Sequence, residues 1–421
     1  MDTAMTFQPS ELMTVHDREV LRRLAAEVAE IAARPAEAEK RELWYRLNAL
    51  QDVRPLVFCS PENGWGEIIL QEHLECETAH SRNWEFHLRQ EIFWGNEMAD
   101  DRVVTGTFDV GYGHTQSDWG VQETYTHGAN GGSYVWDAPV KDLGDLSHLR
   151  FPVIEVDYAA NERLLNFARE TFGDLLSVRQ HQIWCCSVGL TWPLVRLRGL
   201  EQVLMDMSLE PDGLKALMAF LRDGHMALLQ SVENQGLLHL NNAGDYVGSG
   251  GWGWSHELPQ PDFDGTVRLK DLWILAESQE TIGVSPKMFE EFVFPYQLPL
   301  IEMFGLSCYG CCEPIDNRWH LVKTIPNLRR VSVSPWSDVE VMAQNLQDKY
   351  IFSMKPNPAM LAGENFDEDF IRQDLRTKLE QAKGCRVEII MKDNHTIGGD
   401  PTRVKRWSRI AREEADRVWD G

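Results

Sequence analysis

The sequence lacks a long apolar run, and it has far fewer basic than acidic residues. Spanning a bilayer takes about 20 consecutive apolar residues, and no stretch of the chain approaches that length. Lysine and arginine number 41 against 65 aspartate and glutamate residues, so the formal net charge is −24. Such a surface repels polyanions. We therefore expect neither a membrane nor a nucleic acid as a partner.

Several other signals are missing. Residues 1–11 lack the basic-then-apolar order of a secretion signal. The 8 cysteines stand at irregular positions, including the adjacent pairs Cys185-Cys186 and Cys311-Cys312, which is not the spacing of a disulfide framework. No internal repeat or low-complexity run occurs. We expect a cytoplasmic protein with reduced thiols, some buried as small apolar residues and some available as ligands.

What the chain does contain is a regular alternation of helical and strand patterns. Apolar residues recur at helical spacing over Val15 to Arg34 and Ala36 to Leu50, which predicts an amphipathic helical hairpin. Short apolar runs beginning near residues 55, 176, 237, 272, 306, 329, 350 and 386 predict eight core strands with helices between them. Such alternation implies parallel strands joined by right-handed crossovers.

Eight strands are the number that closes a TIM barrel. We predict an α/β protein with two regions, an N-terminal helical extension (1–53) and a (β/α)8 barrel (54–421). The aromatic and Gly-rich segment from Gly111 to Asp137 is predicted to be an ordered excursion from the barrel that shields a pocket. In a barrel, residues that follow the strands gather on one face, where barrel enzymes keep their active sites.

The most informative of these strand ends is the stretch from Gly305 to Pro314, which contains three cysteines and Glu313. Cys311, Cys312, Glu313 and His395 follow two different strands and would meet at the barrel mouth. Thiolate, imidazole and carboxylate groups can hold a mononuclear zinc with one open position. One of the adjacent cysteines can instead be a packing residue. The alternative reading is that all are inert core thiols, with His395 bonded to a loop carbonyl.

Two further strand ends carry titratable groups. Glu277 follows the apolar run Leu272 to Ala276, where its pKa can rise into the working range of an acid or base. It can equally stand at the start of a helix, where its charge complements the dipole. Lys355 directly precedes a proline, which suits a positioned cation for an anionic substrate, and a simple salt bridge is its other reading. Tyr246, with Glu277 or His395, is a candidate for handling protons.

Other rim residues suit substrate binding. The loop after the strand near residue 237 has glycines at 248, 250, 251 and 253 that match no phosphate-binding fingerprint. Trp252 and Trp254 in that loop are predicted either to cover a flat or hydrophobic ligand as part of a mobile lid or to pack against the rim. Asn241, Gln279 and Trp336 complete the predicted substrate-binding residues.

Five short motifs in a particular order resemble the uroporphyrinogen decarboxylase superfamily, over roughly Arg54 to the C-terminus. They are Asp118-Trp119-Gly120; Gly189-Leu190-Thr191-Trp192-Pro193 with Gly199-Leu200-Glu201; Ser285-Pro286-Lys287-Met288-Phe289; the cysteine-rich strand end; and Ser334-Pro335-Trp336-Ser337-Asp338. The superfamily contains decarboxylases and corrinoid-dependent methyltransferases on a shared barrel.

The resemblance implies the methyltransferase branch. The decarboxylases carry an Arg-Gln-Ala-Gly-Arg segment that grips substrate carboxylates, whereas Cys59 to Gly64 here has no arginine. The methyltransferases hold zinc on a His-x-Cys at a strand end and a late Cys. Here either Tyr309-Gly310-Cys311 or Gly310-Cys311-Cys312 stands at the first place and His395 in the region of the second, so the ligand types are permuted.

The sequence therefore predicts a zinc-dependent methyltransferase that moves a methyl group between a small O- or N-methyl compound and a corrinoid carried by a partner protein. Glu277, Lys355 and Tyr246 are its predicted catalytic residues. One alternative is a lyase that decarboxylates a small carboxylic acid with Lys355 and Glu277. Another is a non-catalytic barrel that binds a tetrapyrrole or corrinoid. The oligomeric state is left open, a homodimer included.

Overall fold

A six-stranded parallel sheet organises the fold. The computed structural model describes residues 13–127 and 134–419. The strand order is β1 (Leu56–Cys59), β14 (Arg386–Met391), β13 (Ile351–Met354), β12 (Leu328–Val333), β11 (Leu306–Tyr309) and β10 (Trp273–Ala276). All five pairings are parallel. Their residues are almost all buried, as expected for apolar runs in a sheet covered on both faces.

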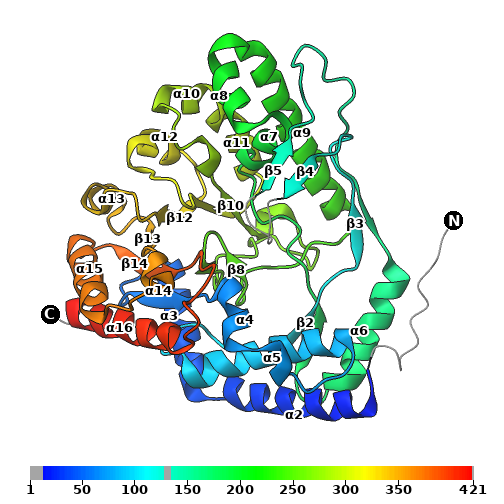
Figure 1. Cartoon of the computed structure of the whole chain (residues 1–421), viewed down its shortest axis with the longest axis vertical. Coiled ribbons are helices and arrows are strands. Elements are labelled where there is room, and N and C mark those ends of the chain that lie inside the picture. The colour runs from blue at the N-terminus through cyan, green and yellow to red at the C-terminus, as the bar shows by residue number, and fades with distance from the viewer. Residues whose placement is uncertain (1–12, 128–133, 420–421) are drawn as a thin grey trace.

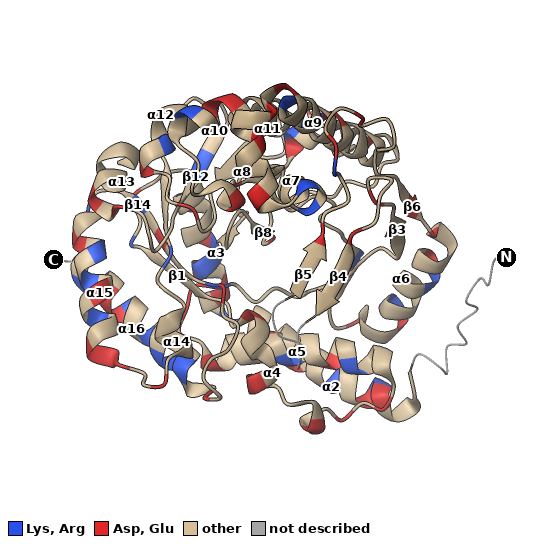
Figure 2. Cartoon of the chain, turned by 45° about the horizontal axis from the view of Figure 1, so that its top comes forward, with Lys and Arg blue, Asp and Glu red and all other residues tan. Residues whose placement is uncertain are grey.

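Helices surround these strands (Figure 1). They are α2 (Val15–Ala32), α3 (Pro35–Asn48), α4 (Trp65–Ile68), α5 (Ala79–Glu97), α6 (Tyr158–Phe172), α7 (Thr191–Arg198), α8 (Leu200–Leu209), α9 (Pro211–Asn234), α10 (Pro286–Phe292), α11 (Phe294–Ile301), α12 (Trp319–Val322), α13 (Val339–Leu346), α14 (Ala359–Ala362), α15 (Glu368–Gln381) and α16 (Thr402–Trp419). The outer helices, α15 and α16 among them, carry acidic and basic side chains (Figure 2). Within the described ranges, no helix combines the length and the apolar character needed to cross a bilayer.

Four strand pairs stand apart from the large sheet. β2 (Thr107–Val110) pairs in parallel with β7 (Ser177–Gln180). Three pairs are antiparallel: β3 (His114–Gln116) with β6 (Ile154–Val156), β4 (Thr124–His127) with β5 (Tyr134–Asp137), and β8 (Tyr246–Val247) with β9 (Gly251–Trp252). The predicted excursion from Gly111 to Asp137 supplies β3, β4 and β5, and its residues 128–133 lie outside the described ranges.

The α/β class is confirmed, and both N-terminal helices form, but α2 packs along α5 and not along α3, so the predicted hairpin is wrong. Six of the eight predicted core strands form the large sheet, and the one near residue 176 is β7, which pairs with β2. Among the described residues, strand pairing does not close into a ring.

The strand predicted over Leu237 to Asn241 is wrong, because these residues have no strand structure. The side-chain amide of Asn241 takes the place of a pairing strand at the edge of β10. Its Nδ2 donates to the carbonyl oxygen of Trp273 at 3.0 Å, and its Oδ1 accepts from the Trp273 N–H at 2.9 Å. One side chain therefore satisfies both backbone groups that a ladder would use.

The N-terminal helices are tied into the rest of the chain. α2 buries Leu21, Leu24, Val28 and Ile31 and packs along α5. In α3, the fully buried Asn48 donates to the carbonyl oxygens of Trp252 and Trp254 and accepts from Arg330 on β12.

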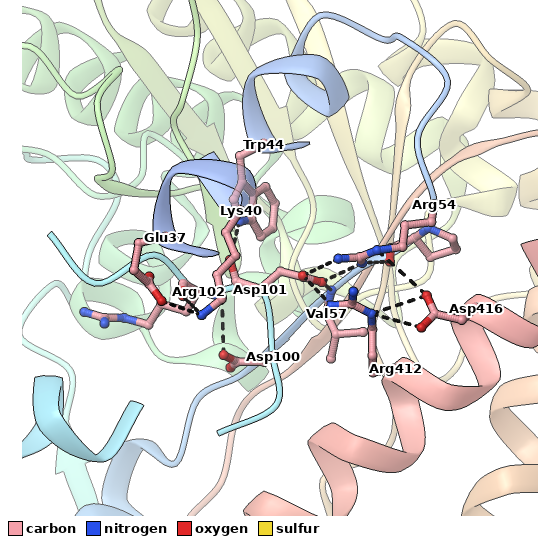
Figure 3. A network of polar contacts seen from close by, with 11 residues as sticks. Glu37, Lys40, Trp44, Arg54, Val57, Asp100, Asp101, Arg102, Arg412 and Asp416 are labelled. Carbon is pink, nitrogen blue, oxygen red and sulfur yellow. Dashed lines mark hydrogen bonds and ion pairs between the residues drawn. The ribbon is translucent and has the colours of Figure 1, made fainter. Parts of the chain in front are cut away.

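A polar network joins α3, β1 and α16 around Asp101 (Figure 3). The Asp101 carboxylate is fully buried and binds Arg54 at 2.5 Å and 2.9 Å, Arg412 at 2.7 Å and the Val57 N–H at 2.8 Å. Trp44 on α3 donates its indole N–H to the Asp101 carbonyl oxygen at 2.7 Å. One residue thus connects helices from the two ends of the chain to the first strand.

Candidate active site

Two adjacent thiols meet at the end of β11. The chain turns at Gly310, whose φ of +92° favours glycine, and then presents Cys311 and Cys312 with their sulfurs 3.6 Å apart. Cys311 Sγ also accepts hydrogen bonds from Ser249 Oγ at 3.4 Å and Lys392 Nζ at 3.7 Å. Cys312 Sγ lies 3.5 Å from Asp393 Oδ2. Segments from three distant parts of the chain therefore converge on this pair.

The two thiols differ in acidity because different charged groups surround them. The contact with Cys312, the Lys392 ammonium and the Ser249 hydroxyl lower the pKa of Cys311 to about 6 against the effect of burial. The same contact raises the pKa of Cys312, and burial and Asp393 raise it further. Cys311 is therefore the more acidic of the two thiols, and its thiolate form is both a nucleophile and a metal ligand.

Residues on neighbouring strand ends surround the pair. Asp393 follows β14 with a φ of +62°, and Glu62 follows β1 with a φ of +48°, conformations that non-glycine residues adopt mainly at functional sites. Glu62 accepts hydrogen bonds from the backbone of Asp393, and burial raises its pKa. Tyr246 is 38% exposed and lies within electrostatic range of Lys392 and Cys311. This placement keeps Tyr246 a candidate for proton handling.

The other two predicted metal ligands make different contacts. Glu313 is fully buried and accepts from the backbone N–H groups of Ser278 at 2.7 Å and Cys311 at 3.0 Å, and burial raises its pKa to about 7. It therefore holds the turn on which the thiols stand. His395 is exposed, with Nδ1 3.3 Å from Asn63 Nδ2. Over the described ranges, His395 makes no hydrogen bond to either cysteine, and no group of three or more His, Cys, Asp or Glu side chains is arranged to hold a metal ion.

Among the predicted ligands, Cys311 and Cys312 have sulfur atoms at a separation that suits binding to one metal ion. Two thiolates bound at about 2.3 Å to one tetrahedral zinc stand about 3.8 Å apart, close to the observed 3.6 Å. Asp393, already in contact with Cys312, is the nearest carboxylate. The structure thus brings together Cys311 and Cys312 of the predicted ligand set, with Asp393 beside them.

A cavity of about 800 Å³ opens next to Glu277. Its wall includes residues from two motifs of the family resemblance: Asp118 and Trp119 from the first, and Gly189, Leu190, Trp192 and Pro193 from the second. Glu277 and Gln279 line the same cavity. Glu277 is 8% exposed, and its Oε1 accepts from Ser187 Oγ at 3.1 Å. Burial, reinforced by the charges of Glu280 and Glu313, raises the pKa of Glu277 to about 8. A carboxyl protonated at neutral pH on a cavity wall is suited to general acid catalysis.

Lys355 is buried away from this cavity. Its Nζ donates to Ser353 Oγ at 2.5 Å, and burial lowers the pKa of Lys355 to about 8. Ser353 in turn donates to Glu388. The amine is therefore less basic than an ordinary lysine.

The remaining predicted substrate-binding residues do not share one site. Trp252 and Trp254 are 9% and 5% exposed and pack in the core beneath α3, so they form no open lid. Asn241 is bonded to β10. Trp336 is 68% exposed, and Gln279 lines the cavity.

The site residues predicted from the sequence did not include Lys392, Ser249 or Asp393. Lys392 and Asp393 directly follow the last predicted strand, so strand-end position alone was an available signal for both. Ser249 stands among glycines and carries no such signal, because only the fold brings it to Cys311.

No family model matches the chain, and a search of curated proteins finds no match. The family resemblance therefore stays a prediction.

Proposed function

We propose that this chain is a (β/α)8 barrel enzyme of the uroporphyrinogen decarboxylase superfamily and belongs to its methyltransferase branch. Three observations support the barrel. Six parallel strands are contiguous, β2 and β7 form a further parallel pair, and the candidate side chains stand after strands β1, β10, β11 and β14, as in barrel active sites.

The reaction proposed is transfer of a methyl group from a small O- or N-methyl compound to a corrinoid carried by a partner protein. The observation that carries this proposal is the pair of thiols 3.6 Å apart at a strand end, with Lys392 Nζ 3.7 Å from one of the sulfurs. Cys311 and Cys312 would hold zinc, with Asp393 as the nearest further donor. Bound there, zinc would act as a Lewis acid on the oxygen or nitrogen that carries the methyl group.

The chain's own residues then have distinct roles. The cavity of about 800 Å³ is large enough for a small organic donor. Glu277, on its wall, holds a proton at neutral pH and donates it to the oxygen or nitrogen atom as the methyl group departs. Gln279 lines the same cavity and offers an amide for orienting the donor. Lys392 balances the charge of the Cys311 thiolate.

One observation favours a second candidate, decarboxylation of a small carboxylic acid. Lys355 is buried with a pKa lowered to about 8, and such an amine can act as a nucleophile toward a carbonyl substrate. This lyase would need Lys355 and no metal on the cysteines.

Metal analysis and turnover assays separate the two candidates. We expect the purified protein to contain about one zinc per chain, which Cys311→Ser with Cys312→Ser removes, while Cys185→Ser with Cys186→Ser, the other adjacent pair, retains it. With free reduced cobalamin as acceptor, methylcobalamin formation from methylated amines and ethers, followed by its absorption spectrum, should depend on Cys311 and on Glu277. Carbon dioxide release from small keto acids that survives loss of the cysteines and is abolished in Lys355→Met would support the lyase instead.

A further inference from the structure

The contact between the two sulfurs allows them to react with each other. Cys311 Sγ and Cys312 Sγ are 3.6 Å apart, and a disulfide needs about 2.05 Å, so the two sulfurs have to approach by only about 1.5 Å. Both residues are half-buried and free, and so accessible to a small oxidant. The chain's other adjacent cysteines differ, because the Cys185 thiol donates its hydrogen bond to the carbonyl oxygen of Ser187, at 3.2 Å.

The surroundings supply what a two-step oxidation requires. Lys392 Nζ, 3.7 Å from Cys311 Sγ, stabilises a negative charge on the sulfur that attacks the oxidant first. Asp393 Oδ2, 3.5 Å from Cys312 Sγ, can take the proton of the second thiol. The left-handed backbone at Asp393 holds its carboxylate beside that thiol.

We propose that Cys311 and Cys312 form a reversible vicinal disulfide when the protein meets a peroxide. The Cys311 thiolate attacks one oxygen of hydrogen peroxide, the O–O bond breaks, and hydroxide leaves and takes a proton from solvent to become water. Cys311 is then a sulfenic acid. Cys312 gives its proton to Asp393 and attacks the Cys311 sulfur, the S–O bond breaks, and the leaving hydroxide takes up that proton. The two thiols lose two electrons in total, and peroxide is reduced to two waters.

Such a bond would be easily reduced. Adjacent Cα atoms are about 3.8 Å apart, shorter than the usual span of about 4.4–6.8 Å across a disulfide, and the resulting strain makes the bond more reducible. Strained disulfides are the labile and regulatory ones. The disulfide would remove both thiols from the proposed metal site, so the methyltransferase would be inactive until a dithiol reduces it.

The test maps thiols in the wild-type protein. Reduced protein, with and without prior treatment with a metal chelator, is exposed to hydrogen peroxide, alkylated and digested for mass spectrometry. We expect the peptide with Cys311 and Cys312 to lose the mass of two hydrogen atoms and to resist alkylation until dithiothreitol is added. The peptide with Cys185 and Cys186 should stay alkylatable in the same sample, which provides an internal control.

Two variants test the order of events. In Cys312→Ser the sulfenic acid on Cys311 should persist and be trapped by dimedone. In Asp393→Asn ring closure should be about 10²-fold slower, the low end of general base effects. The proposal is overturned if chelator-treated protein forms no disulfide, if both adjacent pairs react equally, or if Cys311 reaches sulfinic acid while Cys312 remains a thiol. Because mass is the readout, these results stand whether or not methyl transfer is observed.

Discussion

At the scale of single residues, the surroundings of Glu277 strongly shift the pKa of its carboxyl group. Its pKa is raised from 4.5 to about 8 chiefly by burial, so it enters catalysis protonated. We expect the methyl-transfer rate to fall as the pH rises through about 8, where Glu277 loses its proton. Glu277→Gln should lower the rate by about 10² to 10⁴ and show no such limb in a pH–rate profile. An unchanged profile in Glu277→Gln would assign the limb to another group.

The same group links folding stability to pH. Because the folded-state pKa of Glu277 lies above the unfolded value, the folded state holds the extra proton, and the free energy of unfolding decreases as the pH rises from 4.5 to about 8. Its slope is about 1.4 kcal/mol per pH unit. In urea titrations, the stability of Glu277→Gln relative to wild type should therefore increase over this range.

Gly189 has no side chain, and Glu277 occupies the space that a side chain at position 189 would fill. A Cβ at residue 189 would lie 2.4 Å from Glu277 Oε1 and 2.5 Å from the Glu277 carbonyl oxygen. Gly189→Ala should displace Glu277, lower the alkaline pKa of the pH–rate profile as the carboxyl becomes hydrated, and destabilise the protein by about 1–3 kcal/mol. Gly283→Ala is the matched control, because a Cβ there has no neighbour within 4 Å. Equal effects of the two substitutions would argue against a steric role for residue 189.

At the scale of secondary-structure elements, Asp101 holds α3, β1 and α16 together. Asp101→Asn removes a buried charge between Arg54 and Arg412, and breaking a buried ion pair costs about 3–5 kcal/mol. We expect the free energy of unfolding, measured in urea, to fall by an amount in that range. Asp52→Asn removes an ion pair with Arg386 whose aspartate is 75% exposed, so its effect should stay below about 1 kcal/mol. A similar loss in both variants would contradict the importance of burial.

At the scale of the whole molecule, the N-terminal helices and the remaining chain share one core. Leu21, Leu24, Val28, Trp44 and Leu47 are each at most 2% exposed, and α2 packs along α5. Removing the helices would uncover the apolar surfaces that these side chains cover. A chain of residues 54–421 should therefore lack native near-ultraviolet circular dichroism and aggregate.

The matching control supplies residues 13–53 as a separate co-expressed chain, which we expect to restore a soluble complex. Cooperative unfolding of residues 54–421 alone would instead show that the predicted region boundary separates independently folding parts.

Local patterns were sufficient for much of this architecture. The apolar runs around Pro55, Trp273 and Ile389 predicted buried parallel strands, because a strand covered on both faces needs apolar side chains on both. Position after the strands that begin at Trp273 and Leu306 also indicated Glu277, Cys311 and Cys312. Hydrophobic periodicity could not reveal that Asn241 replaces a strand. Its side-chain amide makes the two backbone hydrogen bonds to Trp273 that a strand would make, and this is a tertiary contact.

The sequence by itself determined the α/β class, the order of elements and the strand ends where chemistry gathers, because these depend on hydrophobic spacing along short segments. Only the tertiary structure decided which side chains meet. It put Ser249, Lys392 and Asp393 around the thiols, committed Glu313 to the turn and buried Trp252 and Trp254 under α3. The physical reason is that these contacts join residues far apart in the chain, so they exist only once the helices and strands have packed.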